Sequence, residues 1–170
     1  MRWGILILGL LGLVLLQTSA VPAFEMLGVA PNILLVVLCC WAVVRTPTEA
    51  MVLIPLAGVA IGLLSFQGTA ESVAAFAPIV LIAALRGPIA GGMRMNLRTE
   101  YIWALAVIIV ATLLHFIALA VAIEVAGSRI DWVGAVTDRM LPSVLINLSV
   151  GAVIYWLVRL PTQRPQPRVV

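Results

Sequence analysis

Charged residues are scarce in this chain of 170 residues. Only 10% of its residues are Asp, Glu, Lys or Arg, whereas 64% are hydrophobic and the mean hydropathy is +1.20. An ordinary soluble domain carries about 25% charged residues, so this composition excludes a water-soluble globular fold. We expect one all-α domain whose outer surface faces the lipid bilayer, because helices satisfy their backbone polar groups internally.

Lysine is absent, and all ten basic residues are arginines. They occur one or two at a time between apolar runs, and no basic stripe interleaved with aromatic residues is present. This distribution excludes a nucleic-acid surface, despite a net charge of +3 and a pI near 9.5. It is typical instead of the topology signals of membrane proteins.

Residues that carry chemistry are also few. Cys39 and Cys40 are adjacent in an apolar run and cannot form a disulfide framework, so we interpret them as packing residues. The sequence has no Gly-rich phosphate loop before a Lys, no His-Glu-x-x-His and no acid pair inside a helix. The acids lie between apolar runs or at their edges. We therefore expect neither an enzyme nor an ion-driven pump, and no cofactor or metal.

Six apolar runs predict a six-helix transmembrane bundle over residues 1–160, with spans at about 3–20, 27–44, 47–66, 70–85, 100–125 and 141–160. The first run has the outline of a signal peptide, but five further runs follow and favour a retained span. Residues 128–140 predict a short helix at the membrane interface. The Pro-rich residues 161–170 predict a disordered cytoplasmic tail.

Local signals place several helix ends. Thr46 and Glu49 are three apart with Pro47 between them, which predicts a capped helix start and makes residues 31–66 a membrane hairpin. Pro55 predicts a kink in that helix. Residues 67–69 predict a turn, and the sequence Arg-Gly-Pro at 86–88 predicts the end of the fourth helix.

Arginine counts on alternate sides of the six spans predict the orientation. If the N-terminus is cytoplasmic, only Arg129 and Arg139 lie outside, which is the bias of the positive-inside rule. Both termini are then predicted to be cytoplasmic. The inside would hold Arg2, Arg45, Arg86, Arg94, Arg98, Arg159, Arg164 and Arg168.

Polar residues within the spans are candidates for function. His115 lies mid-span, where a charged form is costly, so it is a functional candidate by default. We favour a simpler interpretation, a neutral His hydrogen-bonded to another helix, because Glu124 is the only acid in the body of its run. Asn147 and Ser149 are expected to hydrogen-bond across helices.

Glycines predict close helix contacts. Gly58 and Gly62 are four apart, so one face of the third span has no side-chain bulk. We hypothesise that this face forms a seam with the second span, which opens at Pro31 and Asn32. The seam serves either helix packing or a partner. Packing inside the bundle is the favoured interpretation, and it extends to Gly9 and Gly12 of the first span.

These stretches resemble the rod shape-determining protein MreD family. In that family a first span ending in Leu-Leu-Gln-Thr-Ser, here residues 15–19, precedes a second span opening with Pro-Asp/Asn-Leu-Leu-Leu, here residues 31–35. Residues 58–64 resemble its Gly-rich third span, and residues 141–155, with Leu-Pro-Ser, Asn147 and Tyr155, resemble its last. The family commonly has an Asp soon after the third span's Gly-Leu-Leu, and residues 65–67 hold none.

The resemblance implies a non-enzymatic inner-membrane scaffold of the bacterial elongation machinery, which acts in peptidoglycan synthesis beside MreC and the wall synthases. MreD-like chains also resemble the vitamin-binding subunits of energy-coupling-factor transporters, which is our alternative. Those subunits often dock a coupling protein through Ala-x-x-x-Ala in the first span, which is absent here. A ligand pocket is also disfavoured because polar and aromatic residues of the outward loops are sparse: Phe24, Glu25, Gln67, Glu71 and Trp132. Lipid handling is a third possibility.

Overall fold

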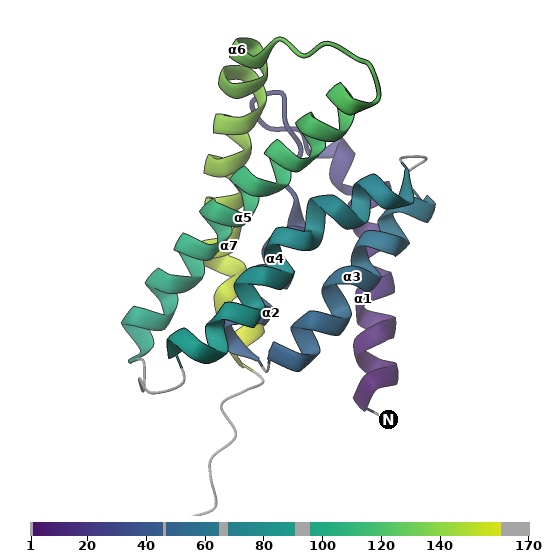
Figure 1. Cartoon of the computed structure of the whole chain (residues 1–170). Helices are drawn as coiled ribbons and strands as arrows, with labels where there is room; N and C mark the ends of the chain where they lie inside the picture. Colours follow the sequence, from purple (N-terminus) through teal and green to yellow (C-terminus); the bar gives the residue numbers. More distant parts are fainter. Residues whose placement is uncertain (1, 46, 65–67, 91–95, 161–170) are drawn as a thin grey trace, which may run out of the picture.

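The computed structural model describes residues 2–45, 47–64, 68–90 and 96–160, which form helices and their connections and contain no β-strand (Figure 1). The predicted all-α class is therefore confirmed. Thr46 and the predicted tail at 161–170 lie outside the described residues. The elements are α1 (Arg2–Ser19), the 3₁₀ turn η1 (Val21–Ala23), α2 (Ile33–Val44), α3 (Pro47–Leu64), α4 (Thr69–Ala90), α5 (Leu97–Val125), α6 (Trp132–Gly134), the π-helix η2 (Ala135–Met140) and α7 (Leu141–Arg159).

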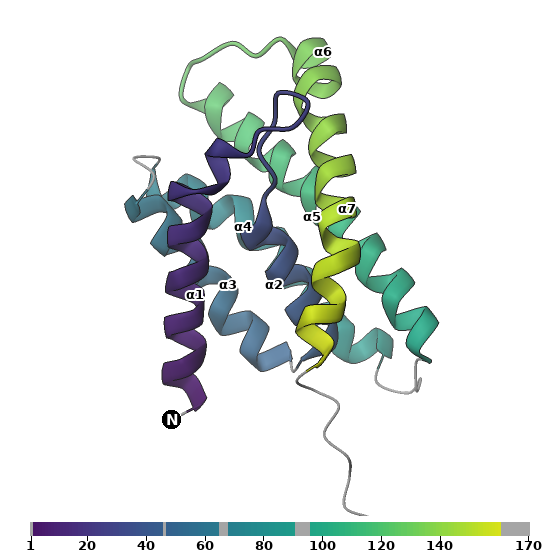
Figure 2. The ribbon, with the colours of Figure 1, turned by 180° about the vertical axis from the view of Figure 1, so that it is seen from behind.

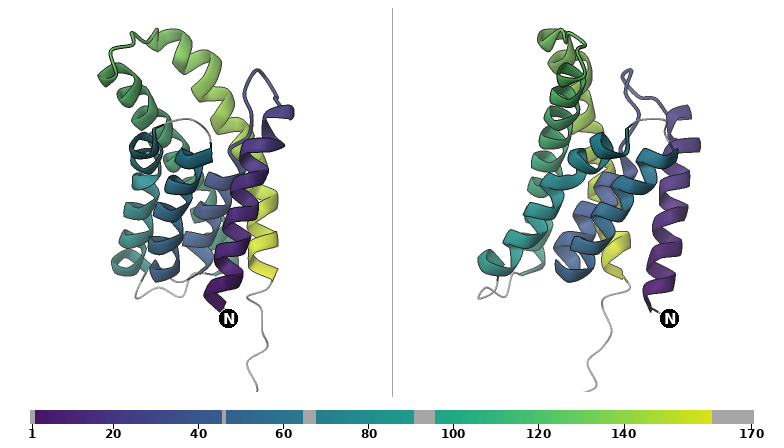
Figure 3. Two further views of the ribbon diagram at one scale, coloured as in Figure 1. Left: turned by 90° about the vertical axis from the view of Figure 1, so that its right-hand side faces the viewer. Right: turned by 45° about the vertical axis from the view of Figure 1, so that its right-hand side comes forward.

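The helices run up and down between two ends of a bundle, and the connection from α5 to α6 arches over the end opposite the N-terminus (Figures 1 and 3). The short helix α2 is central, with contacts to α1, α3, α4, α5 and α7. No side chain of α2 is exposed. Its leucines and valines, together with Cys39 and Cys40, form the middle of the hydrophobic core.

Three helical stretches of the described chain are long and apolar enough to cross a membrane. They are Trp3–Ala23, Leu97–Val125 and Trp132–Arg159, with mean hydropathies of 2.2, 2.8 and 1.9. The other apolar helices, Ile33–Val44, Thr48–Leu64 and Thr69–Ala84, are shorter. Large exposed aliphatic side chains cover the outside of α1, α5 and α7. These features are those of a membrane protein.

The second predicted span differs from the helix that forms. The predicted span starts near residue 27, but α2 begins at Ile33. Leu27 and Gly28 both have positive φ, 56° and 76°, so the chain turns there instead of starting a helix. Pro31 also disfavours helical geometry at the residue before it. A non-helical segment therefore descends into the bundle before α2 starts (Figure 2).

The predicted interface helix at 128–140 is not a separate element. Asp131 caps a helix that starts at Trp132 and continues through η2 and α7 to Arg159. Pro142 should disturb this helix, because its ring crowds the carbonyl four residues earlier. The wider turns of the π-helix end at Met140, two residues before Pro142, and local π-helical turns are one way in which a helix satisfies the backbone groups that a proline frees. The helix therefore passes the proline without ending.

Two other boundaries also shift. Helix α4 continues to Ala90, so the predicted end at residues 86–88 is wrong. Pro88 lies only two residues before the end of α4, where the hydrogen bond it removes is one of the last in the helix. Helix α5 begins at Leu97, earlier than predicted, because the side chain of Asn96 accepts a hydrogen bond from Thr99 N–H at 2.8 Å. Pro55, where a kink is predicted, lies inside α3.

Candidate functional site

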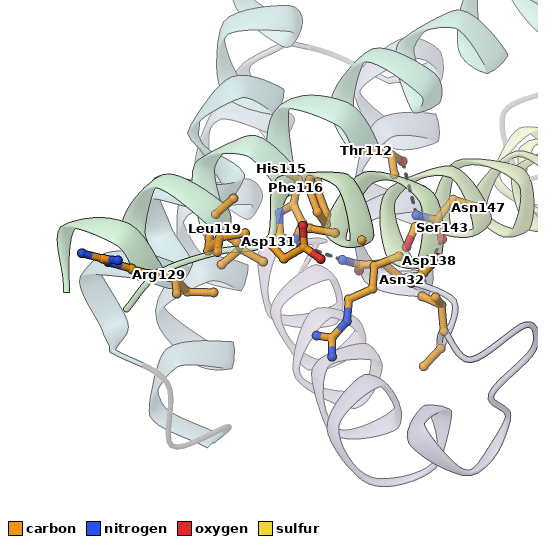
Figure 4. Close-up of a pocket in the computed structure, with 18 residues that line it drawn as sticks. Asn32, Thr112, His115, Phe116, Leu119, Arg129, Asp131, Asp138, Ser143 and Asn147 are labelled. Carbon is orange, nitrogen blue, oxygen red and sulfur yellow. Dashed lines mark hydrogen bonds between the residues drawn. The ribbon is translucent and has the colours of Figure 1, made fainter. Parts of the chain in front are cut away.

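Polar side chains from separate helices meet inside the apolar bundle at the start of α2. We call them the polar cluster: Gln17 of α1, Asn32 before α2, Thr112 and His115 of α5, and Asn147 of α7. Figure 4 shows all of them except Gln17. The cluster connects residues up to 115 positions apart in the chain.

Asn32 and Asn147 form the centre of the cluster. The Asn32 side chain accepts from Leu35 N–H at 3.0 Å and thereby caps α2. The Asn32 backbone N–H donates to Asn147 Oδ1 at 2.8 Å, and Asn147 Nδ2 donates to Thr112 Oγ1 at 3.2 Å. Asn147 is only 2% exposed. One buried amide thus joins α2, α5 and α7.

The hydrogen bonds of His115 define its tautomer. Asn32 Oδ1 is occupied by the cap, so Asn32 Nδ2 is the atom that faces His115 Nε2, at 3.4 Å. Nε2 must then accept, and Nδ1 carries the proton that it donates to the carbonyl of Ala75 at 3.0 Å. The edge of the ring meets Phe76, with centroids 5.1 Å apart. His115 is therefore assigned as a neutral imidazole bonded to α4.

Gln17 attaches α1 to the start of α2. Its Nε2 donates to the carbonyl of Pro31, and its Oε1 accepts from Leu34 N–H, both at 3.2 Å. The first turn of a helix has amides without intrahelical partners, and Gln17 and Asn32 each supply an acceptor to one of them. Sequence reasoning did not select Gln17 as a site residue. The sequence feature that could have indicated Gln17 is its polar amide side chain near the end of an apolar run.

A cavity of about 630 Å³ lies between the polar cluster and the α5–α6 connection (Figure 4). Four residues of the polar cluster form its floor, apolar side chains form its walls, and charged residues lie toward its mouth. The residues concerned are Asn32, Thr112, His115 and Asn147 in the floor, Phe116, Leu119, Ala120 and Ile123 in the wall, and Arg129, Asp131, Asp138, Arg139 and Ser143 toward the mouth. We call this the main cavity.

A second cavity, of about 510 Å³, lies on the other side of His115. It is lined by residues of α1, α3 and α4, among them Gln17, Ile61 and Ser72. Both cavities share Asn32, His115 and Leu119. The hydrogen-bonded pair of Asn32 and His115 therefore lies between two hollow regions of the bundle.

The charged groups at the mouth of the main cavity differ in their partners. Asp131 Oδ1 accepts from Val133 N–H at 3.2 Å, and Asp138 Oδ1 accepts from the Thr137 hydroxyl at 2.8 Å. Neither guanidinium, of Arg129 or of Arg139, forms a hydrogen bond or ion pair with another described residue. The arginines thus retain donors for a further group.

The predicted seam residues lie at two different places. Asn32 belongs to the polar cluster and the carbonyl of Pro31 accepts from Gln17 of that cluster, whereas Gly58 and Gly62 lie against α4. A Cβ on Gly58 would be 2.9 Å from Val73 Cα, and one on Gly62 would be 2.5 Å from Thr69 Cα. The close approach is therefore between α3 and α4, not between α3 and α2.

Three other residues differ from their sequence-based interpretation. A Cβ on Gly9 or Gly12 would have nothing within 4 Å, so these glycines make no close helix contact in the described chain. Ser149 is exposed and donates to Leu145 of its own helix at 2.8 Å, not across helices. By contrast, Gly151, which sequence reasoning did not select, allows Ile108 of α5 to approach α7.

The end of the bundle near the N-terminus carries its own polar contacts. Arg159 pairs with Glu100 at 2.8 Å and donates to the Tyr155 hydroxyl at 2.6 Å, which joins α7 to the start of α5. Glu49 is 5% exposed and accepts from Trp41 Nε1 at 3.2 Å. These charges hold helix ends together and lie outside both cavities.

No protein-family model, curated protein or solved structure matches this chain. Within the described residues, no group of three or more His, Cys, Asp or Glu side chains could hold a metal ion. Functional inference therefore rests on the polar cluster, the main cavity and the sequence resemblance.

Proposed function

We propose that this chain is a non-enzymatic scaffold in the bacterial inner membrane that serves cell elongation and peptidoglycan synthesis. Its partners in this proposal are an MreC-like protein and cell-wall synthases. The proposal rests on the resemblance of short sequence stretches to the MreD family and on the contacts between residues of these stretches in the structure.

The observation that carries the proposal is that residues from the stretches resembling the MreD family lie close together in the structure. Gln17, Pro31, Asn32 and Asn147 come from three separate stretches that resemble the family, and hydrogen bonds join them at the polar cluster. Tyr155, from the last of these stretches, is fully buried beside Arg159 and Glu100. Short motifs that meet in space support a shared architecture better than motifs that are merely present in the sequence.

The proposed topology has six spans and both termini in the cytoplasm. Arg45 at the end of α2, Arg98 at the start of α5 and Arg159 at the end of α7 lie toward the end of the bundle that holds the N-terminus (Figure 1). Arg129 and Arg139 lie toward the opposite end. This separation supports the orientation given by the positive-inside rule.

Helix α2 needs a further argument, because its 12 residues extend only about 18 Å at 1.5 Å per residue. A hydrocarbon core is about 30 Å thick. The non-helical segment before α2 can supply the remainder of the crossing. Residues 29–32, the part of this segment next to α2, are buried or half-buried, and their polar backbone is acceptable at that depth because Gln17 and Asn147 provide hydrogen bonds.

Affinity capture tests the scaffold. The tagged full chain is solubilised in detergent from its native membrane, and co-purifying proteins are identified by mass spectrometry against a tagged six-span protein of unrelated function. We expect enrichment of an MreC-like protein or a wall synthase. Enrichment of paired ATPases with a membrane coupling subunit would overturn the scaffold in favour of a transporter subunit.

The main cavity is the observation that favours the second candidate, a vitamin-binding subunit of an energy-coupling-factor transporter. Outward loops sparse in polar and aromatic residues argue against a ligand, but three of the four floor residues, Thr112, His115 and Asn147, lie on helices α5 and α7. A volume of about 630 Å³ lies within the usual range of ligand pockets, about 300–1,000 Å³. The same capture experiment distinguishes the two candidates.

A further inference from the structure

We propose that the main cavity is a binding site for a small amphipathic anion. Such a ligand has a neutral hydrogen-bonding group at one end, a compact apolar body and a carboxylate or phosphate at the other end. This inference does not depend on the scaffold function, because it concerns what the cavity accepts and not which proteins the chain binds.

The floor of the cavity has unused hydrogen-bonding capacity. A side-chain amide offers two donors and two acceptor lone pairs. The Asn147 side chain donates one hydrogen bond to Thr112 and accepts one from the Asn32 backbone. The Asn32 side chain donates one hydrogen bond to His115 and accepts one from Leu35 N–H. Each amide therefore retains a donor and an acceptor. Buried polar groups favour occupied hydrogen bonds, so the floor suits a neutral group that both donates and accepts, such as an amide, a hydroxyl or a heteroaromatic N–H.

The polar floor argues against two other occupants. A lipid chain that entered end first would place its terminal methyl group against Asn32 and Asn147 and would leave the second amide donor of each side chain unpaired. A bare anion at the start of α2 is disfavoured because Gln17 and Asn32 already accept from the amides of Leu34 and Leu35. The buried end of the ligand is therefore polar and uncharged.

The walls and the mouth define the rest of the ligand. Phe116, Leu119 and Ile123 lie between floor and mouth, so the middle of the ligand is apolar. At the mouth, Asp131 caps α6 and Asp138 accepts from Thr137, whereas Arg129 and Arg139 have no partner in the described chain. Guanidinium groups bind carboxylate and phosphate with paired hydrogen bonds. Asp131 and Asp138 keep their charge, so the four charged groups at the mouth cancel formally, and it is the free guanidinium donors that favour a carboxylate or phosphate there.

Cysteine labelling tests this charge preference. Ser143 is half-buried and lines the main cavity toward its mouth, four residues after Arg139. The native Cys39 and Cys40 are both 0% exposed, so Ser143→Cys introduces one accessible thiol. The detergent-solubilised full chain is treated with an anionic reagent, sulfonatoethyl methanethiosulfonate, or a cationic one, trimethylammonioethyl methanethiosulfonate. Ser19→Cys, at the exposed end of α1, is the matched control.

We expect the anionic-to-cationic rate ratio to be about tenfold higher at Ser143→Cys than at Ser19→Cys, the low end of the effect of charged clefts on local concentration. Adding Arg139→Gln should lower the ratio, and adding Asp138→Asn should raise it. Both side chains are exposed, so neither change should disturb folding. A ratio at Ser143→Cys equal to or below the control, or one unmoved by Arg139→Gln, would overturn the anion preference.

Protection by a defined probe tests occupancy. Indole-3-acetate has an N–H donor, an apolar ring system and a carboxylate. At millimolar concentration it should slow labelling of Ser143→Cys several-fold and leave Ser19→Cys unchanged. Equal labelling with and without the probe would overturn the proposed ligand class. Protection by phosphatidylglycerol vesicles but not by indole-3-acetate would also overturn it, because the anion would then belong to a lipid.

Discussion

At the scale of single residues, the buried amide of Asn147 has the clearest structural role. It accepts from the backbone of Asn32 and donates to Thr112, so three helices depend on one side chain. Replacing it with Leu removes both bonds and leaves the Asn32 N–H without its acceptor. The size of the resulting loss depends on how much of the bundle can relax around the new side chain.

We expect Asn147→Leu to lower the free energy of unfolding by about 1–3 kcal/mol, the cost of an unsatisfied buried group. Thermal unfolding of the detergent-solubilised chain measures this loss. Ser149→Ala is the matched control on the same helix, because Ser149 is exposed and bonds only within α7. Equal midpoints for the two variants would contradict the role given to Asn147.

Sequence alone could predict that His115 and Asn147 bond between helices, because a polar group in an apolar run needs a partner. It could not predict which partner. Asn147 and Asn32 are 115 residues apart, and their meeting depends on the register of α7 against α2, which no local spacing encodes. Gln17 was not predicted for the same reason, because its two hydrogen-bond partners, the Pro31 carbonyl and Leu34 N–H, lie outside its own helix.

At the scale of helices, the contact between α3 and α4 is the closest approach to a neighbouring backbone made by any glycine of the described chain. Gly58 and Gly62 lie against the backbone of Val73 and Thr69, and backbone atoms cannot move aside as a flexible side chain can. The four-residue spacing of the glycines predicted a close approach, but the neighbour turned out to be α4. Short connections join α3 to both α2 and α4, so connection length alone does not specify which helix the glycine face meets.

Gly62→Ala should therefore destabilise the chain by about 1–3 kcal/mol, as overpacking does in well-packed interiors. Gly12→Ala is the matched control, because nothing lies within 4 Å of its added Cβ and alanine favours the helix. Unfolding midpoints in one detergent compare the two variants. If Gly62→Ala melts no lower than Gly12→Ala, α3 and α4 are not packed as the structure describes.

Helix ends were predicted less well than helix positions. The start of α2 moved because of the turn with positive φ at Leu27 and Gly28, and the expected interface helix merged with α7. In the second case, Pro142 is a stop signal in the sequence, yet the π-helix Ala135–Met140 accommodates it. Whether a proline ends a helix depends on the turns before it, which residue types alone do not specify.

At the scale of the whole molecule, the arginines separate toward two ends of the bundle, and this separation underlies the proposed orientation. The start of α3, which includes Thr48, lies at the same end of the bundle as the N-terminus, and the connection from α5 to α6, which includes Ser128, arches over the opposite end (Figure 1). Both residues are exposed. They are therefore suitable positions for reporting which side of the membrane each end occupies.

With the inner membrane intact, a membrane-impermeant maleimide should label Ser128→Cys and should leave Thr48→Cys unlabelled until the cells are lysed. The fully buried Cys39 and Cys40 keep the background low. Labelling of both positions in lysed cells is the control for thiol reactivity. The reverse pattern in intact cells would contradict cytoplasmic termini.

The late start of α2 also bears on how the chain enters the bilayer during synthesis. A 12-residue helix is too short to be recognised and inserted as an independent span of about 20 residues. Gln17 of α1, which accepts from Leu34 N–H in the first turn of α2, is synthesised before α2. Asn147, which accepts from Asn32 N–H, is synthesised 115 residues after Asn32. In the proposed six-span topology, insertion of the second crossing therefore relies on its neighbours, α1 before it and α7 long after it.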